Sequence, residues 1–330
     1  MIVLGGLRAV SDIVGPVFLA LVLTVLMHPV RRMLTSRRAP GWLATVLCIL
    51  GVYLILISLA AAMVIAASRF ATLIPTYQDD LQSLVDDVTA SLNDMGVSER
   101  ELQSFADSLD LSRLSDLVLG IAGGLVSVVS NLILIFTVVL FMALDASTFP
   151  ANLAAIARGQ SGHASLVSSF SSFASGTRTY LLVSTVFGLI VAVIDTIALE
   201  LMGVPLPLVW GLLAFITNYI PNIGFVIGLI PPAVLALLEG GPSLMITVIV
   251  AYIVINFILQ SVIQPKFVGD AVGLSTSITF LSLVFWAFVL GPLGALLAVP
   301  LTLLVKAVLI DADPRNAWLV PLLSSKPVES

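Results

Sequence analysis

Long runs of apolar residues are the feature that most restricts what this chain can fold into. They occupy positions 1–30, 41–68, 117–144, 179–201, 205–238, 243–263 and 276–311. A helix needs about 20 consecutive apolar residues to cross the hydrocarbon core of a bilayer. Only 10% of the residues are charged and 59% are hydrophobic, whereas a soluble domain carries about 25% charged residues. The sequence therefore predicts an all-α, polytopic helical membrane protein with about seven or eight transmembrane helices.

Residues 1–74 are predicted to form an N-terminal transmembrane unit. Its first run contains Arg8, Asp12 and the pair Gly15-Pro16, so it is either one kinked helix or the inner part of a longer helix that the chain enters midway. The loop 31–38 that follows carries four arginines in eight residues. The positive-inside rule places such a loop in the cytoplasm.

Residues 75–116 differ in kind from the rest of the chain. They hold ten acidic side chains against two arginines, with apolar residues at helical spacing. We predict a small extramembrane helical hairpin, whose acids either form a solvated face or dock a partner. Residues 117–178 are predicted to add one transmembrane helix and an amphipathic region along the membrane interface.

Residues 179–311 form the predicted transport core, because two of its apolar segments are interrupted. The segment 205–238 is split at positions 220–224, and the segment 276–311 is split at positions 291–294; both interruptions contain Pro and Gly. Irregular backbone at membrane depth survives only where protein covers it or where it lines a wet cavity, and broken helices often mark a transporter's binding site. The alternative is two ordinary helical hairpins with tight turns. Residues 312–330 form a C-terminal tail.

Polar side chains favour the wet cavity over the dry hairpins. Five amide residues fall in the first interruption and the span that follows it, and Asn256 and Gln260 share a helix face. The residues predicted to line or gate a path for a solute or ion are Asn218, Pro221, Asn222, Gly224, Asn256, Gln260, Gln264, Pro265, Gly291, Pro292 and Gly294.

Two carboxylates lie within or at the end of the apolar run 179–201. A carboxylate at the centre of a membrane helix costs about 2.5–3.5 kcal/mol on insertion scales, so acids in such positions are candidates for a function. Asp195 is the deeper of the two and Glu200 lies nearer the end of the run. Both are candidates for ion coupling.

Several other classes of protein are excluded by what the sequence lacks. It has no Gly-x-Ser-x-Gly or His-Glu-x-x-His motif, no phosphate-binding lysine loop, and no Cys/His spacing typical of a metal site. No basic run with interleaved aromatic residues indicates nucleic-acid binding. We therefore predict no enzyme activity, no cofactor and no resident metal, and a carrier or channel driven by a gradient.

Most of the chain resembles the autoinducer-2 exporter family of bacterial permeases, and the resemblance is most specific over residues 205–311. The resemblance rests on Pro221-Asn222-Ile223-Gly224 with Pro231-Pro232, on Asn256 and Gln264-Pro265-Lys266, and on Gly273-Leu274-Ser275, Phe285-Trp286, Gly291-Pro292-Leu293-Gly294 and Val299-Pro300-Leu301-Thr302. It implies about eight membrane helices, an extramembrane helical insert, and homo-oligomers in the bacterial inner membrane, with a pentamer as one form. It also implies export of autoinducer-2 or exchange of sodium or lithium for protons.

Two departures from the family pattern bear on mechanism. Many relatives have Glu where this chain has Gln264, so a titrating carboxylate is absent there, and attention moves to Asp195, Glu200 and Asp270. Relatives also begin with a longer apolar segment than this chain does.

Three hypotheses of function follow. The leading one is a secondary transporter that exports a small polar solute, such as an autoinducer-2-like signalling molecule or a related metabolite, across the bacterial inner membrane. The second is a monovalent cation (Na+ or Li+)/proton antiporter. The third is a non-transporting membrane scaffold that docks a partner through the acidic hairpin 75–116. The partners expected are the lipid bilayer, the solute, Na+ or H+, and further copies of the chain.

Overall fold

The computed structural model describes most of the chain outside its acidic insert. Described are residues 10–73, 132–145, 163–221, 223–264 and 273–319, with the single positions 6, 8, 152, 267 and 323. The predicted hairpin 75–116 therefore lies outside the described residues. Within the described ranges the chain is helical and forms no strand, as the all-α prediction requires.

Ten helical elements are labelled in chain order. They are α2 (Ser11–Ser36), α3 (Gly41–Leu73), α8 (His163–Leu201), α9 (Pro207–Thr217), α10 (Gly224–Asn256), the π-helix η2 (Phe257–Ile263), α12 (Thr276–Leu296), α13 (Ala298–Lys306), the π-helix η4 (Ala307–Asp311) and the 3-10 helix η5 (Pro314–Leu319). Among the described residues, five helices are long and apolar enough to cross a membrane, and two shorter apolar helices accompany them. The prediction of a polytopic helical membrane protein is confirmed.

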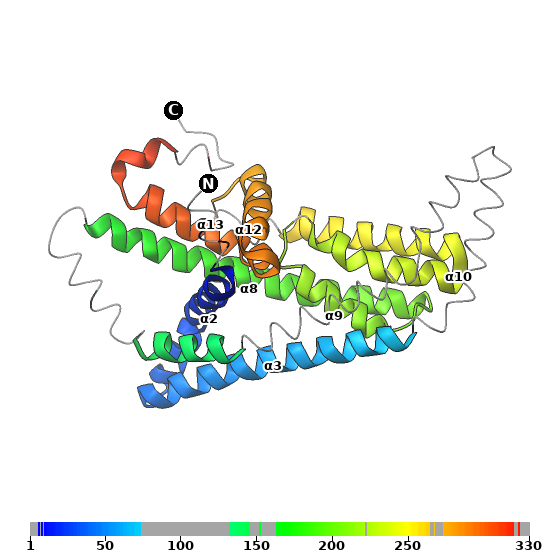
Figure 1. Cartoon of the computed structure of the whole chain (residues 1–330), viewed down its shortest axis with the longest axis horizontal. Helices are drawn as coiled ribbons and strands as arrows, with labels where there is room; N and C mark the ends of the chain where they lie inside the picture. Colours follow the sequence, from blue (N-terminus) through cyan, green and yellow to red (C-terminus); the bar gives the residue numbers. More distant parts are fainter. Residues whose placement is uncertain are drawn as a thin grey trace.

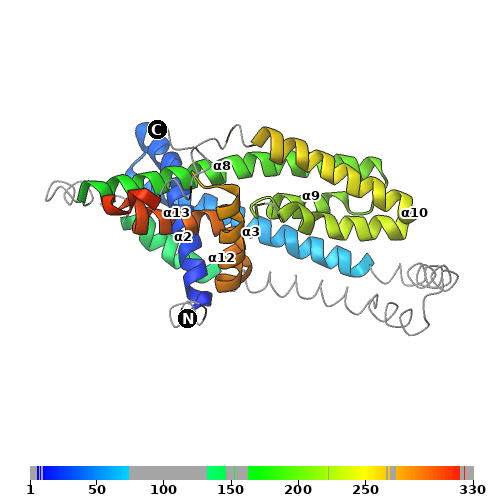
Figure 2. The same cartoon turned by 90° about the horizontal axis from the view of Figure 1, so that it is seen from above.

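The helices lie in two crossing directions (Figure 1). α3, α8, α9 and α10 run along the long axis of the molecule, whereas α2 and α12 run across it and contact each other. Figure 2 shows the same arrangement from above, with α9 next to α10. α8 contacts both groups, because it packs against α9 and α10 and also against α2 and α13. It is the helix that joins α9 and α10 to α2 and α13.

α8 begins earlier than the sequence indicated. Apolar residues begin near position 179, but the helix starts at His163 and continues for 39 residues. Its first turns contain many serines, and Ser168 and Ser169 donate hydrogen bonds to the carbonyl oxygen of Ser165. A serine hydroxyl satisfied within its own helix no longer competes with the helical backbone for partners. The amphipathic region predicted for 146–178 therefore ends in a regular helix.

The first interrupted segment folds as two antiparallel limbs joined by a turn. α9 has only 11 residues, which is about 16 Å at 1.5 Å per residue and too short to cross a core of about 30 Å. α10 itself doubles back at Gly240 and Gly241, where Gly241 takes a φ of 70°. Its limbs, 224–239 and 242–256, return the chain toward α8, which gives a hairpin that enters the fold and leaves on the same side.

The second interrupted segment repeats this plan. α12 is broken at Gly291, whose φ is 66°, and after Pro292 the chain turns back into α13. Both predicted breaks, near 221 and near 292, are confirmed. Pro221 and Pro292 lack the N–H that a continuous helix would use, and Gly291 takes a backbone conformation that other residues adopt only with strain.

Candidate functional site

A cavity of about 390 Å³ lies where the first break meets α8 and the end of α10. That is room for a small molecule. Its walls are polar or aromatic in part and carry no charged side chain among the described residues. The residues that line it are Tyr180, Ser184, Asn218, Pro221, Phe225, Ile253, Asn256, Phe257, Gln260, Ser261 and Gln264.

The turn after α9 is fixed to α8 by three hydrogen bonds. The Tyr180 hydroxyl donates to the carbonyl oxygen of Tyr219 at 3.0 Å, and the hydroxyls of Tyr219 and Thr185 lie 2.7 Å apart. The side-chain amide of Asn218 donates to the carbonyl oxygen of Ser184 at 2.8 Å. A turn without regular backbone pairing depends on such partners to satisfy its polar groups. α8 therefore sets the position of the break.

Three amides form one hydrogen-bonded chain along the cavity wall. The Gln260 amide nitrogen donates to the side-chain oxygen of Asn256 at 2.6 Å and to that of Asn218 at 3.0 Å. Asn256 in turn donates to the carbonyl oxygen of Tyr252 at 2.8 Å. Asn218 and Asn256 are both buried, and buried amides left without partners would be costly. The chain of amides joins the turn of the first break to the end of α10.

The amide chain keeps unused hydrogen-bonding capacity that faces the cavity. A side-chain amide offers two donors and one carbonyl acceptor. Within the described residues, the carbonyl oxygen of Gln260 accepts no hydrogen bond, and the Gln264 side chain also lines the cavity. The hydroxyl of Ser184 is buried in the wall of the same cavity. These groups can bind hydroxyl and carbonyl groups of a neutral solute.

Two glycines make the close packing of this site feasible. A Cβ at Gly188 would lie 2.9 Å from the side-chain nitrogen of Asn218, so the bare backbone of α8 leaves the space that this amide fills. A Cβ at Gly224 would lie 1.9 Å from the carbonyl oxygen of Thr217. The two limbs of the hairpin therefore meet backbone to backbone, and Gly224 begins α10 directly beneath the turn.

Gln260 lies in the π-helix η2, which the sequence did not predict. A π-helix widens the helical turn and is found mostly as a short insertion at functional sites. Asn256 ends α10 immediately before η2, so the widened turns begin at the amide pair. The register change helps to point Gln260 and Gln264 toward one cavity. Nothing in the residue types of 257–263 signals a π-helix over an α-helix.

The structure brings together only part of the predicted path. Asn218, Pro221, Asn256, Gln260 and Gln264 line the cavity, and Gly224 lies at the turn. Asn222, Pro265 and Asp270 lie outside the described residues.

The second break takes no part in lining the cavity. Gly291, Pro292 and Gly294 lie in the α12 turn, where Leu293 packs against Gly15 of α2. The two breaks thus do not share this cavity within the described structure, because α2 lies against the second one. A role for the second break in the path stays a prediction.

The two candidate carboxylates of α8 lie in opposite environments. The Asp195 side chain is completely buried, with 0% of its surface exposed, and neither carboxylate oxygen has a hydrogen-bond partner. Glu200 is exposed near the end of the helix. Helical spacing explains the difference, since positions five apart face different sides of a helix. Only Asp195 has the environment of an intramembrane functional acid.

Several residues of the site were not singled out by the sequence analysis. Tyr180, Ser184 and Gly188 lie one and two turns apart on the face of α8 that holds the break. A small-residue face on an otherwise apolar helix was the available signal, because small residues permit close helix contacts in membranes. It does not tell which helix makes the contact.

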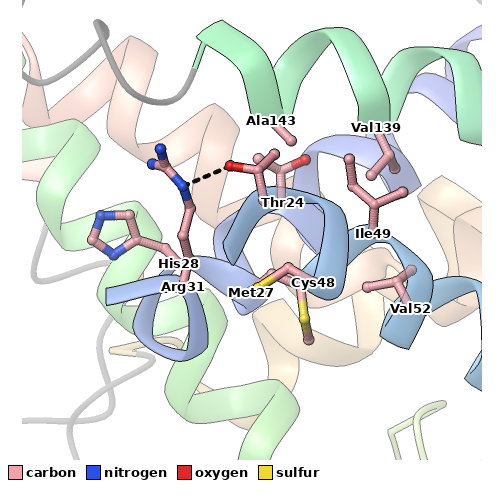
Figure 3. A pocket seen from close by; sticks show the side chains of 10 residues that line it. Thr24, Met27, His28, Arg31, Cys48, Ile49, Val52, Val139 and Ala143 are labelled. Atoms are coloured by element: carbon pink, nitrogen blue, oxygen red, sulfur yellow. Dashed lines mark hydrogen bonds between the residues drawn. The ribbon is translucent and has the colours of Figure 1, made fainter. Parts of the chain in front are cut away.

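A second, smaller cavity lies between α2, α3 and the helix Leu132–Asp145 (Figure 3). Its volume is about 30 Å³, little more than one water. The walls are mainly apolar, with His28 and Arg31 at one side, and the Arg31 Nε donates to the Thr45 hydroxyl at 2.9 Å. It is too small for an organic solute.

Side chains that commonly bind metals are spread out in the part of the chain that the structure describes. No three His, Cys, Asp or Glu side chains come together there. Cys48 is a buried free thiol in the wall of the smaller cavity. The cavity beside Asn218 offers amide, hydroxyl and aromatic groups for hydrogen bonding and apolar contact.

Comparison with known proteins points to one family of transporters. The sequence profile of the AI-2E family transporters matches residues 1–312. The AI-2 transport protein TqsA of Escherichia coli strain K12 is 30% identical over 310 residues, covering 94% of this chain and 89% of TqsA. A Haemophilus influenzae protein named by an expected role in transport is 32% identical over 329 residues, covering 98% of this chain and 93% of its own length. YhhT of Escherichia coli strain K12, similarly named, is 29% identical over 309 residues, with 93% and 86% covered.

Proposed function

The chain belongs to the family of AI-2E transporters, and on that premise we propose that it exports a small, uncharged polar solute through the cavity beside Asn218. It is a multi-pass protein of the bacterial inner membrane. An AI-2-like signalling molecule is the first solute to test, because the relative TqsA is named for AI-2 transport. The same premise supports a transporter and not an enzyme.

The observation that carries the proposal is the uncharged, amide-lined cavity at a break between short helical limbs. Amides, hydroxyls and aromatic rings line it, and no described charged side chain does. A charged solute entering such a site would lose its hydration without gaining a counter-charge, which is costly. A neutral molecule with several hydroxyl or carbonyl groups would exchange its hydrogen bonds with water for those with Gln260 and Gln264. We therefore expect the solute to be neutral and to carry several hydroxyl or carbonyl groups.

The hairpin geometry supports passage at this point. α9 is about 16 Å long by its 11 residues and helical rise, so the turn at its end lies inside the fold and not at its surface. The cavity opens beside that turn. A site reached halfway along the molecule leaves only a short barrier on either side, which is the arrangement of transporters with broken helices. A movement of the hairpin against α8 would open one side or the other.

The experiment is a flux assay with the full chain reconstituted in liposomes loaded with AI-2. We expect AI-2 efflux from these liposomes and none from AI-2-loaded liposomes that contain no protein. Replacing Gln260 by Leu removes its two hydrogen bonds, which leaves the side-chain oxygens of Asn218 and Asn256 without their donor. At about 1–3 kcal/mol for buried groups left without partners, efflux should fall about tenfold. Thr247→Val is the matched control, since Thr247 is an exposed residue of α10 away from the cavity.

Two outcomes would contradict the proposal. If the protein is well folded and AI-2 efflux never exceeds that of AI-2-loaded liposomes without protein, AI-2 is excluded as the solute. A screen of other neutral polyols and hydroxyketones in the same liposomes would then test the solute class itself. Equal flux in Gln260→Leu and Thr247→Val would remove the cavity from the path.

The other hypotheses lead to different results in the same assay. An antiporter would move protons in response to an imposed Na+ or Li+ gradient without any organic solute. A scaffold built on residues 75–116 would show no flux, and deletion of those residues would release a bound partner. The homo-oligomer implied by the family resemblance stays a prediction, which native mass spectrometry of the purified protein tests.

A further inference from the structure

The most unusual polar group outside the cavity is the carboxyl of Asp195. It is fully buried in α8, and neither of its oxygens has a hydrogen-bond partner. It is the only carboxyl that is buried in the described part of the chain. An ionised carboxylate without partners is strongly disfavoured in such a place, so a buried acid stays neutral unless a cation joins it.

No described cation compensates Asp195. On α8 itself, Arg178 lies 17 residues away, about 25 Å along the helix, and Glu200 is exposed. α9 contributes no titratable residue, and Glu239 of α10 is exposed at the tip of its hairpin. α2, α13 and η4 pack against the first half of α8, near Phe173 and Tyr180. The titratable groups of those three elements are Asp12, His28, Arg31, Arg32, Lys306 and Asp311.

One titratable group does approach Asp195, and it is Tyr252 of α10. Tyr252 belongs to the same buried cluster as Leu199, which lies one helical turn after Asp195 on α8. The Tyr252 hydroxyl is buried and, like the Asp195 carboxyl, has no hydrogen-bond partner. Buried polar groups without a hydrogen-bond partner are rare in folded proteins, and each needs an explanation. Here two of them lie on the contacting elements α8 and α10.

The surroundings fit a proton better than a hard divalent cation. Ca2+ and Mg2+ are typically bound by about six or more oxygen ligands. Here the carboxyl and the Tyr252 hydroxyl supply three, and the nearby Thr196 hydroxyl already donates to the carbonyl oxygen of Ala192 at 2.7 Å. A proton needs no such shell, since the neutral acid is a stable form of the group.

Tyr252 also connects Asp195 to the solute cavity. Its carbonyl oxygen accepts the hydrogen bond from Asn256, and Asn256 is bound to Gln260, which is bound to Asn218. A shift of the α10 limb 242–256 at Tyr252 would therefore move Asn256 and the cavity wall with it. Such a shift has a cause: an ionised Asp195 needs a donor, and the Tyr252 hydroxyl is the one at hand.

We propose that Asp195 is a proton-binding site that is linked to the solute cavity through Tyr252 and Asn256. In the structure described here the carboxyl holds a proton. When it releases the proton to water, the carboxylate accepts a hydrogen bond from the Tyr252 hydroxyl, and the α10 limb moves toward α8. The link to solute transport rests on the function proposed above, whereas the bound proton does not.

Infrared spectroscopy of the full chain in lipid tests the bound proton without any transport assay. At pH 7 exposed carboxyls are ionised, so a protonated carboxyl gives a separate carbonyl band. We expect that band in the wild type and in Glu200→Gln, and its loss in Asp195→Asn. A wild type without the band, or an Asp195→Asn variant that keeps it, would overturn the proposal. Loss of the wild-type band on adding Na+ at constant pH would also overturn it, because the site would then bind sodium.

The linkage is tested by measuring AI-2 efflux from liposomes at a series of pH values. For a single linked proton, wild-type efflux should change by up to about tenfold per pH unit on one side of its transition. Asp195→Asn mimics the protonated acid and should make efflux independent of pH, and Tyr252→Phe should shift the transition. The same pH profile in wild type and Asp195→Asn would refute the linkage. If wild type moves no AI-2 at any pH, the proposed solute fails, while the infrared band still decides whether Asp195 binds a proton.

Discussion

Adding one methyl group at Gly224 should open the first broken hairpin, and the backbone around it sets the size of the effect. The Cβ of an alanine there would lie 1.9 Å from the carbonyl oxygen of Thr217, whereas real Cβ contacts essentially never fall under 3.0 Å. The limbs must separate by about 1.1 Å, and the obstacle is backbone, which cannot rotate away. The same oxygen accepts the turn hydrogen bond from the Ile220 amide at 2.8 Å, so the alanine would strain that bond as well.

The cost can be estimated from these two effects. Overpacking of a well-packed site costs about 1–3 kcal/mol, and a strained or lost hydrogen bond adds about 1 kcal/mol. We therefore expect Gly224→Ala to destabilise the protein by about 2–4 kcal/mol. Gly51→Ala is the matched control, because a Cβ at Gly51 meets nothing within 4 Å in α3. There the greater helix propensity of alanine should stabilise by up to about 1 kcal/mol.

Thermal unfolding of both variants in one detergent measures the difference. Gly224→Ala should unfold at a clearly lower temperature than the wild type, and Gly51→Ala at the same or a higher one. AI-2 efflux should fall in Gly224→Ala even below its unfolding temperature, since the Asn218 turn moves with the hairpin. If the two alanine variants were equally stable, the close backbone contact at this turn would be refuted.

Three further substitutions test other parts of the structure. Gly188→Ala places a Cβ 2.9 Å from the Asn218 amide, so AI-2 efflux should fall several-fold with little loss of thermal stability; unchanged efflux would contradict the docking of this turn on α8. Gly294→Ala places a Cβ 1.9 Å from the carbonyl oxygen of Trp286 and should lower the unfolding temperature as Gly224→Ala does; a stable variant would refute the second hairpin. Leu199→Ala empties a fully buried position and should cost about 2–5 kcal/mol in unfolding free energy, and a cost under about 1 kcal/mol would show that α8 is not packed there as described.

The positions of both breaks could be predicted because their causes are local. Pro221 and Pro292 each remove a helical N–H, and Gly291 takes a backbone conformation that favours glycine, wherever the neighbouring helices lie. The proximity of Asn256 and Gln260 was also predictable from their spacing on one helix. What joins them to Asn218 was not, because that contact depends on how the hairpin folds back across α8.

The limits of prediction have the same physical origin. α8 was expected to begin near 179, where its apolar residues begin, but serines that bond within the helix let it start at His163. The π-helix η2 is chosen by the contacts of the folded state and leaves no mark in the sequence. Gly188 looks like any glycine of a membrane helix until Asn218 is placed against it. Tertiary contacts decide all three, and a single sequence does not contain them.

The two hairpins share one backbone device but differ in chemistry, and that difference suggests how the work is divided. In each, a missing Cβ lets one limb approach a carbonyl oxygen of the other, at Gly224 and at Gly294. Only the first carries amides: beside the second, Ser282 and Trp286 both bond to Thr302, which leaves their donors occupied within the hairpin. A limb whose polar groups satisfy one another has none to offer a solute. The second hairpin is therefore suited to supporting or closing the path, and the first to binding what passes along it.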